Sequence, residues 1–434
     1  MNRRFKFAVV STSSCLVALM LFGAVRGRSA SPEDTYRHLA VFTEVLSRIK
    51  SDYVEEPDMK NVTLGALNGL LESIDPYASY LNADQYKEYL KARDQHRADV
   101  GLVLARRFGY VGVVASIPNS PAANAGLVTG DVLESINGVS TRDMPLAYAE
   151  MLLQGDPGSS VEVGILRFRN PEPTKIALKR EMIKFPPVTG RIMADNVGVI
   201  TVESLADGEV KEVANQVRLL EKQGAKRFVL DLRKCATGDP DKGIALANLF
   251  LNKGLIAYSE GQKVAREDYD AKPGEAITSL PLAVITDRGT ADGAEVTAAA
   301  LEDDKRAEVV GEPTYGDAAI RRAVTMDDGS AVILSVAKFY SPSGKSIQDN
   351  HVTPTVAMLE SEPVPESDDD SGPAIQPNAA PQQTRPSDDP LLRKAIDVVT
   401  SGNHEMADRG QTPAQENGSP RPVMTPLNVP KDNN

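Results

Sequence analysis

The sequence predicts a multidomain α+β protein with a helical N-terminal region, a small β domain with helices, and an α/β core. Between residues 36 and 95, apolar residues such as Leu39 and Phe42 recur at helical spacing. Short β-rich runs separated by turns that contain Gly and Asp follow over residues 98–170. Strands and helices then alternate over residues 180–356, which indicates a layered core with a mainly parallel sheet.

Composition excludes several classes of protein. The 434 residues are enough for two or three domains. Because 60 Asp and Glu outnumber 48 Lys and Arg, giving a formal charge of −12, we expect no nucleic-acid partner. Two cysteines and four scattered histidines are too few for a disulfide scaffold or a paired zinc cluster. We therefore expect no metal site and no cofactor.

The N-terminus predicts export. Arg3, Arg4 and Lys6 precede an apolar run over residues 7–25. This run of roughly 18 residues fits either a signal peptide within residues 1–30 or an anchor in the inner (plasma) membrane. We expect the body of the protein to lie outside the cytoplasm, in the periplasm or another extracytoplasmic space.

The tail, residues 357–434, differs from the rest of the chain. It holds 12 of the 29 prolines and has 13 acidic against 6 basic residues. An acidic, proline-rich segment of this kind predicts disorder. The exception is residues 389–400, whose apolar spacing predicts a short amphipathic helix that docks on the body.

The β-rich block resembles a PDZ domain. The resemblance rests on Ser120-Pro121-Ala122, Gly126-Leu127, Gly130-Asp131-Val132-Leu133 and Ile136-Asn137-Gly138. In such a domain a peptide adds as a strand beside a groove, while N–H groups of a loop receive its terminal carboxylate. The resemblance implies a peptide-binding site made of Val100, Gly101, Leu102, Val103, Leu146, Ala149 and Leu153. The alternative is a β domain that serves only as a spacer.

Over residues 36–356 the chain also resembles the carboxy-terminal processing peptidases of family S41, the tail-specific protease type. The segments that carry this resemblance are Asp75 to Leu81, Phe228 to Arg233, Ala307 to Gly316 and Phe339 to Gln348. The family is a serine-type endopeptidase in which a neutral lysine activates a serine nucleophile and a glutamine orients the lysine. An alcohol needs such a base, and a lysine can be neutral only when burial lowers its pKa.

The catalytic positions implied by this resemblance are all changed. Gly289 and Glu295 align the nucleophile segment, which places Asp292 at the serine position. Asp317 then stands at the lysine position and Arg321 at the glutamine position. In the turn that supplies the oxyanion hole, Thr237 replaces the first glycine and Gly238 follows it. A β-branched residue there restricts how closely the backbone approaches a substrate, so stabilisation of an oxyanion is also in doubt.

The leading hypothesis is a pseudopeptidase that binds peptides or protein C-termini through its PDZ domain. Three alternatives stay open: an active serine-type endopeptidase that processes the C-termini of exported proteins, an enzyme that uses Asp292 and Asp317 as paired carboxylates, and residual peptidase activity through another group. Besides peptides, the expected partners are an active relative and a membrane bound through the N-terminal segment. By resemblance alone, helices at 36–72 and 389–400 predict a homodimer.

Overall fold

The structure of the protein is a computed structural model that describes residues 32–359 and 389–401, except for residues 94, 96, 108, 143, 168, 169 and 207. The predicted leader and almost all of the predicted acidic tail lie outside the described residues. Within the part of the chain that is described, no helix is both long and apolar enough to cross a bilayer.

Two compact units divide the chain, with the boundary after Leu67. The first contributes α2 (Pro32–Asp52) and the start of α3 (Met59–Glu72). On α2, apolar side chains at helical spacing are exposed, including Val41, Phe42 and Val45. Within the described residues, α2 therefore leaves apolar side chains uncovered.

The second unit begins with the PDZ-like part, in which six strands form an antiparallel sheet in the order β2-β3-β4-β6-β7, with β5 beside β4. The predicted Asn137-Gly138 turn joins β4 to β5, and both residues have positive φ, as tight hairpin turns require. The elements of this part are β2 (Leu102–Arg107), β3 (Tyr110–Ser116), α5 (Pro121–Asn124), β4 (Val132–Ile136), β5 (Val139–Ser140), α6 (Leu146–Leu153), β6 (Ser160–Arg167) and β7 (Asn170–Lys179).

A second sheet forms the α/β core, in the order β17-β14-β13-β10-β9-β8. All of its neighbouring strands are parallel except β8 and β9, so the predicted mainly parallel core is confirmed. Its strands are β8 (Thr189–Met193), β9 (Val197–Thr201), β10 (Arg227–Asp231), β13 (Leu282–Thr286), β14 (Ala307–Gly311) and β17 (Val356–Ala357), with a 3-10 turn η1 (Ala194–Asn196) between the first two.

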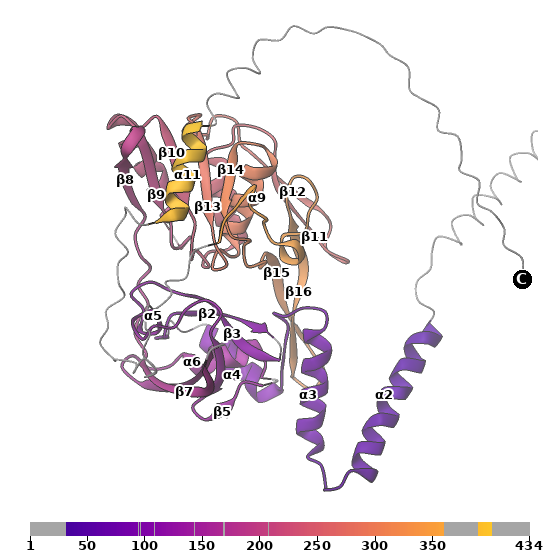
Figure 1. Ribbon diagram of the computed structural model, residues 1–434. Helices are drawn as coiled ribbons and strands as arrows, with labels where there is room; N and C mark the ends of the chain where they lie inside the picture. The colour runs from indigo at the N-terminus through magenta and orange to yellow at the C-terminus, as the bar shows by residue number, and fades with distance from the viewer. Residues whose placement is uncertain are drawn as a thin grey trace, which may run out of the picture. The chain divides into compact units, whose positions relative to one another are not determined.

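Helices cover both faces of this sheet. On one face, Phe228 and Leu230 of β10 pack with α7 (Glu209–Lys222), α8 (Pro240–Asn248) and α9 (Gly293–Asp303). On the other face, Val229 packs with α11 (Pro390–Ser401), which lies across the strands in Figure 1. Alternate residues of one strand thus serve two layers, which is why these strands are apolar almost throughout.

A third sheet was not predicted as such, although it places several site residues. Its order is β1-β16-β11-β12, with β15 also paired to β16, and all pairs are antiparallel. Sequence analysis missed β15 because its arginines and exposed residues give no apolar alternation. The strands are β1 (Ser79–Leu81), β11 (Leu255–Glu260), β12 (Glu267–Asp270), β15 (Ala319–Thr325) and β16 (Ala331–Tyr340); α4 (Ala83–Arg93) follows β1, and α10 (Ile347–Asn350) follows β16.

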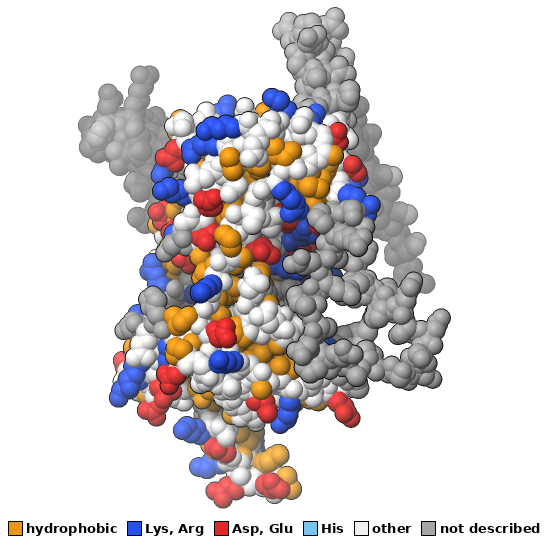
Figure 2. All heavy atoms as spheres, turned by 90° about the vertical axis from the view of Figure 1, so that its left-hand side faces the viewer, with side chains coloured by type: hydrophobic (Ala, Val, Ile, Leu, Met, Phe, Trp, Pro, Cys, Tyr) orange, Lys and Arg blue, Asp and Glu red, His pale blue; other side chains and the backbone are white. Residues whose placement is uncertain are grey.

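The surface in Figure 2 mixes both charge signs. On this face, Lys and Arg side chains are interspersed with Asp and Glu side chains, and hydrophobic side chains lie between them. No continuous basic stripe crosses this view of the described residues.

Candidate functional site

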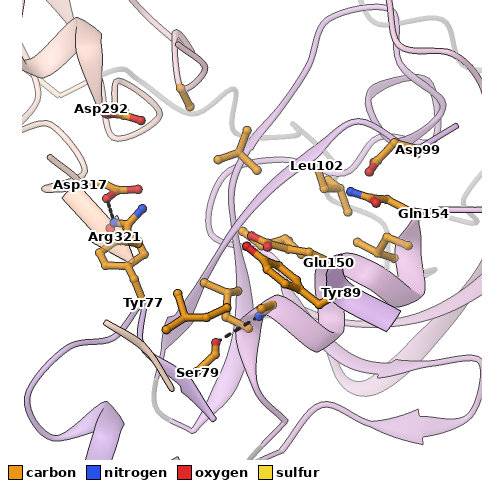
Figure 3. A pocket seen from close by; sticks show the side chains of 17 residues that line it. Tyr77, Ser79, Tyr89, Asp99, Leu102, Glu150, Gln154, Asp292, Asp317 and Arg321 are labelled. Carbon is orange, nitrogen blue, oxygen red and sulfur yellow. Dashed lines mark hydrogen bonds and ion pairs between the residues drawn. The ribbon is translucent and has the colours of Figure 1, made fainter. Parts of the chain in front are cut away.

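One cavity of about 410 Å³ brings the changed catalytic positions and the PDZ-like part together. Asp292 stands immediately before α9, Asp317 lies in the loop between β14 and β15, and Arg321 lies on β15. All three side chains line this cavity, as Figure 3 shows. The three residues that the family resemblance singles out therefore lie around one cavity.

Asp317 and Arg321 form an ion pair. The Arg321 guanidinium donates a hydrogen bond to the Asp317 carboxylate, and its carbon lies 4.1 Å from the centre of the Tyr77 ring. Both partners are partly buried, with 28% of the Arg321 side chain and 15% of the Asp317 side chain exposed. Asp317, which the family resemblance aligns with a lysine, is thus an acid already engaged with a cation.

Glu295 joins the segments that carry the two aspartates. Its side chain is fully buried and accepts hydrogen bonds from the N–H groups of Asp292 at 3.1 Å, Gly316 at 2.6 Å and Asp317 at 2.7 Å. The Thr314 hydroxyl donates a fourth hydrogen bond. Burial raises the pKa of Glu295 to about 7, and the bonds from Thr314, Asp317 and Gly316 oppose that rise.

Burial also dominates the acidity of the aspartates. The pKa of Asp292 lies well above its ordinary value because of burial and the nearby Asp317 charge, while Arg321 lowers it. The pKa of Asp317 is raised by burial, against the ion pair with Arg321. These raised pKa values favour the protonated forms of the two carboxyl groups.

The residues that line the cavity offer no activated nucleophile. Neither lysine, cysteine nor histidine is among the described residues lining it. Ser79 does line it, and its hydroxyl oxygen accepts the N–H of Ala147 at 3.2 Å. Thr290, the hydroxyl nearest to Asp292 in sequence, is fully buried and donates to the Leu232 carbonyl at 2.9 Å. Its oxygen is therefore held in the strand-to-helix turn.

The turn expected to supply the oxyanion hole packs against the start of α9. The Gly238 carbonyl accepts the Gly293 N–H at 3.1 Å, and the Thr237 hydroxyl donates to the Ser204 oxygen at 3.0 Å. Of this turn, only Ala236 lines the cavity, whereas Thr237 and Gly238 do not. Cys235 is fully buried, and burial raises the pKa of its thiol, as expected of a structural cysteine.

The PDZ-like part contributes the other half of the cavity, called here the β2–α6 groove. Its apolar lining is Leu102 and Val103 from β2 with Leu146 and Leu153 from α6. Four of the seven predicted peptide-binding residues thus line the cavity. Val100 and Ala149 are fully buried and Gly101 is buried, so these three lie behind the surface.

Sequence reasoning missed three polar residues of this groove. Asp99 precedes β2, while Glu150 and Gln154 lie one helical turn apart at the end of α6. The spacing of Glu150 and Gln154 on the predicted helix was a usable signal, because residues four apart share one face. Desolvation in the cavity raises the pKa of Glu150 to about 7, against the attraction of Arg321.

Comparison with known proteins supports the family. Residues 112–167 match the PDZ domain model, and residues 196–358 match the model of peptidase family S41. The carboxy-terminal-processing protease of Bartonella bacilliformis is 30% identical over 341 residues, covering 77% of each chain. The carboxy-terminal processing protease CtpA of Bacillus subtilis is 31% identical over 368 residues, covering 82% of this chain and 78% of that protein.

A solved structure shows the same architecture. The photosystem II D1 C-terminal processing protease superposes with a TM-score of 0.61 at 25% identity, over 74% of this chain and 92% of that chain. The matched family models, the similar relatives and this shared architecture agree. The chain belongs to the carboxy-terminal processing protease family, within peptidase family S41.

Proposed function

We propose that this member of the family has no peptidase activity and binds peptide segments or protein C-termini through its PDZ domain outside the cytoplasm. The observation that carries the proposal is the Asp317–Arg321 ion pair beside Asp292, at the three positions where the chemistry of the family is expected. Peptide hydrolysis by this mechanism needs an alcohol and a neutral base within reach of each other. The described site holds two carboxylates and a guanidinium that is always charged.

The retained groove supports peptide binding. The β2 edge and α6 form an apolar channel that lines one cavity with the former catalytic positions. An extended peptide that adds beside β2 would gain main-chain hydrogen bonds and bury apolar side chains in this channel. Loss of the nucleophile does not remove either contribution, so binding is the activity that the geometry supports best.

The alternative is an active serine-type endopeptidase that processes the C-termini of exported proteins. Its support comes from the relatives, which are named as proteases and match most of this chain. The site itself favours the binding protein, because its aligned residues lack both an alcohol and a lysine.

The location outside the cytoplasm rests on the sequence of the leader. Basic residues precede the apolar run over residues 7–25, a pattern typical of exported or membrane-anchored proteins. A fusion of residues 1–30 to alkaline phosphatase, an enzyme that is active only after export, tests this part of the proposal. An inactive fusion that is nevertheless expressed would contradict it.

The test of function compares the full-length chain with the triple variant Asp292→Ser, Asp317→Lys, Arg321→Gln for cleavage of an unfolded protein. We expect the unmodified chain to be inert. The variant Asp292→Ala is the control for contaminating protease, because any cleavage that it retains does not depend on this site. Cleavage by the unmodified chain that Asp292→Ala abolishes would overturn the proposal and indicate carboxylate chemistry.

A further inference from the structure

An internal carboxylate occupies the loop that begins the β2–α6 groove. The Asp99 Oδ1 accepts the N–H of Gly101 at 2.9 Å, and the side chains of Asp99 and Gln154 both line the cavity. Figure 3 shows Asp99 and Gln154 facing each other at the end of the cavity, with Leu102 next to them. Both side chains stand where the loop before β2 meets the end of α6, which the Ala98–Gly155 bridge joins.

The backbone on either side of Asp99 holds it in this position. The Asp99 N–H and carbonyl exchange two hydrogen bonds of 2.9 Å with Glu181, and Ala98 forms a second such pair with Gly155. Because these bridges hold the backbone of residues 98 and 99, Asp99 does not move away from the groove unless their hydrogen bonds break. The position of Asp99 is therefore a built part of the groove.

This arrangement conflicts with the binding of a chain terminus. A PDZ groove receives a terminal carboxylate on N–H groups of the loop before its edge strand. Here Asp99 already satisfies the Gly101 N–H, and a second carboxylate placed beside it would be repelled. The end of the groove at which a chain terminus would stop is closed and negatively charged.

Further along the groove, the charge also favours a cation. Glu150 projects into the cavity from α6, and no hydrogen bond joins it to another described residue. The cavity lining carries four acidic side chains, Asp99, Glu150, Asp292 and Asp317, against the single cation Arg321 among the described residues. Arg321 is already paired with Asp317, so the carboxylate available to a ligand is that of Glu150.

Building on the proposed peptide binding, we propose that the groove selects an internal, basic segment of an extended polypeptide rather than a C-terminus. Asp99 occupies the loop that would receive a terminal carboxylate. The bound polypeptide therefore continues past this point instead of ending there. Glu150 pairs with a Lys or Arg side chain of the segment, while Leu102 and Val103, the partly exposed apolar residues of the groove, contact its apolar neighbours. Asp99 and Glu150 are thus the residues that determine specificity.

The test uses the full-length chain and a library of N-acetylated random octapeptides in two forms, one ending in a free carboxylate and one in a carboxamide. Peptides retained by the immobilised protein are sequenced. We expect the carboxamide form to be retained at least as well as the free acid, with enrichment of Lys and Arg. In Glu150→Gln the basic enrichment falls, whereas retention of peptides persists.

Variants at Asp99 give the matched control. Asp99→Gly frees the Gly101 N–H and should shift retention toward free-carboxylate peptides by roughly tenfold, which corresponds to about 1.4 kcal/mol. Asp99→Asn keeps an oxygen acceptor on that N–H but removes the repelling charge, so it should shift retention less than Asp99→Gly does. A preference of the unmodified chain for free carboxylates or for acidic peptides would overturn this inference alone. Retention of neither form would overturn peptide binding itself and this inference with it.

Discussion

Glu295 shows how one side chain fixes the geometry of the former catalytic centre. Its two oxygens accept hydrogen bonds from the start of α9 and from the loop that follows β14. The two segments are far apart in sequence, and no other described side chain accepts from both. The carboxylate therefore holds together the two segments that carry Asp292 and Asp317.

Removing this carboxylate should destabilise the fold. Glu295→Ala leaves buried N–H groups of Gly316 and Asp317 without their acceptor, and we expect a loss of about 3 kcal/mol in the free energy of unfolding. Urea unfolding, followed by circular dichroism, measures this loss of stability. The control Glu302→Ala, on the same helix but partly exposed, should change stability by no more than about 0.5 kcal/mol. Equal effects of the two substitutions would contradict the role given to Glu295.

Glu150 predicts a pH dependence of stability. Its pKa is raised from 4.5 to about 7 in the folded protein, so between these values the folded state binds the proton more strongly than the unfolded state does. The contribution of this group to the free energy of unfolding therefore falls as pH rises from about 4.5 to about 7. Glu150→Gln, which does not titrate, should lose part of this decline between pH 5 and pH 8. An unchanged decline would show that Glu150 does not titrate in this range.

At the scale of elements, the site depends on how closely two helices cross. A Cβ built on Gly243 of α8 would lie 1.9 Å from the Gly293 carbonyl oxygen at the start of α9. Only glycine fits at this crossing, which also positions Asp292 one residue before the helix. The helices α8 and α9 thus pack by backbone contact, so a displacement of either helix moves Asp292.

Gly243→Ala and Gly69→Ala should have opposite effects. The first forces α8 away from α9, and we expect a loss of about 2 kcal/mol in the free energy of unfolding. Gly69 lies on α3 with no atom within 4 Å of a built Cβ, so alanine there should stabilise its helix by up to roughly 1 kcal/mol. Thermal unfolding of both variants compares them directly. An unaffected Gly243→Ala would show that the crossing is looser than described, and a destabilised Gly69→Ala would show that its site on α3 is not open.

At the scale of the whole molecule, the sequence predicted what rests on local patterns. The parallel core followed from apolar strands alternating with helices, and the shared position of Asp292, Asp317 and Arg321 followed from the family alignment. The placement of Asp99 at the end of the groove did not, because it depends on long-range bridges such as that between Ala98 and Gly155. Strand β15 was missed because its pairing with β16, rather than an apolar pattern, makes it a strand.

The exposed apolar surface of α2 leads to a prediction about assembly. Val41, Phe42 and Val45 share one side of the helix and are 56%, 40% and 51% exposed, which is unfavourable in water unless a partner covers them. By family resemblance the expected partner is a second copy of this chain. Sedimentation velocity should therefore find a dimer, and Phe42→Glu should weaken it by at least tenfold, since a charge would then be buried at the interface.

Ser47→Glu is the matched control for this assembly, because it adds the same charge to the opposite side of α2 and should leave the dimer intact. If both variants dissociate the dimer equally, the added charge acts through repulsion over the whole helix and not through this apolar surface. If the unmodified chain sediments as a monomer at every concentration, the α2 surface serves some other contact and self-association is excluded. A dimer lost only in Phe42→Glu would place α2 at the interface. The groove that we expect to bind peptides lies in a later part of the sequence.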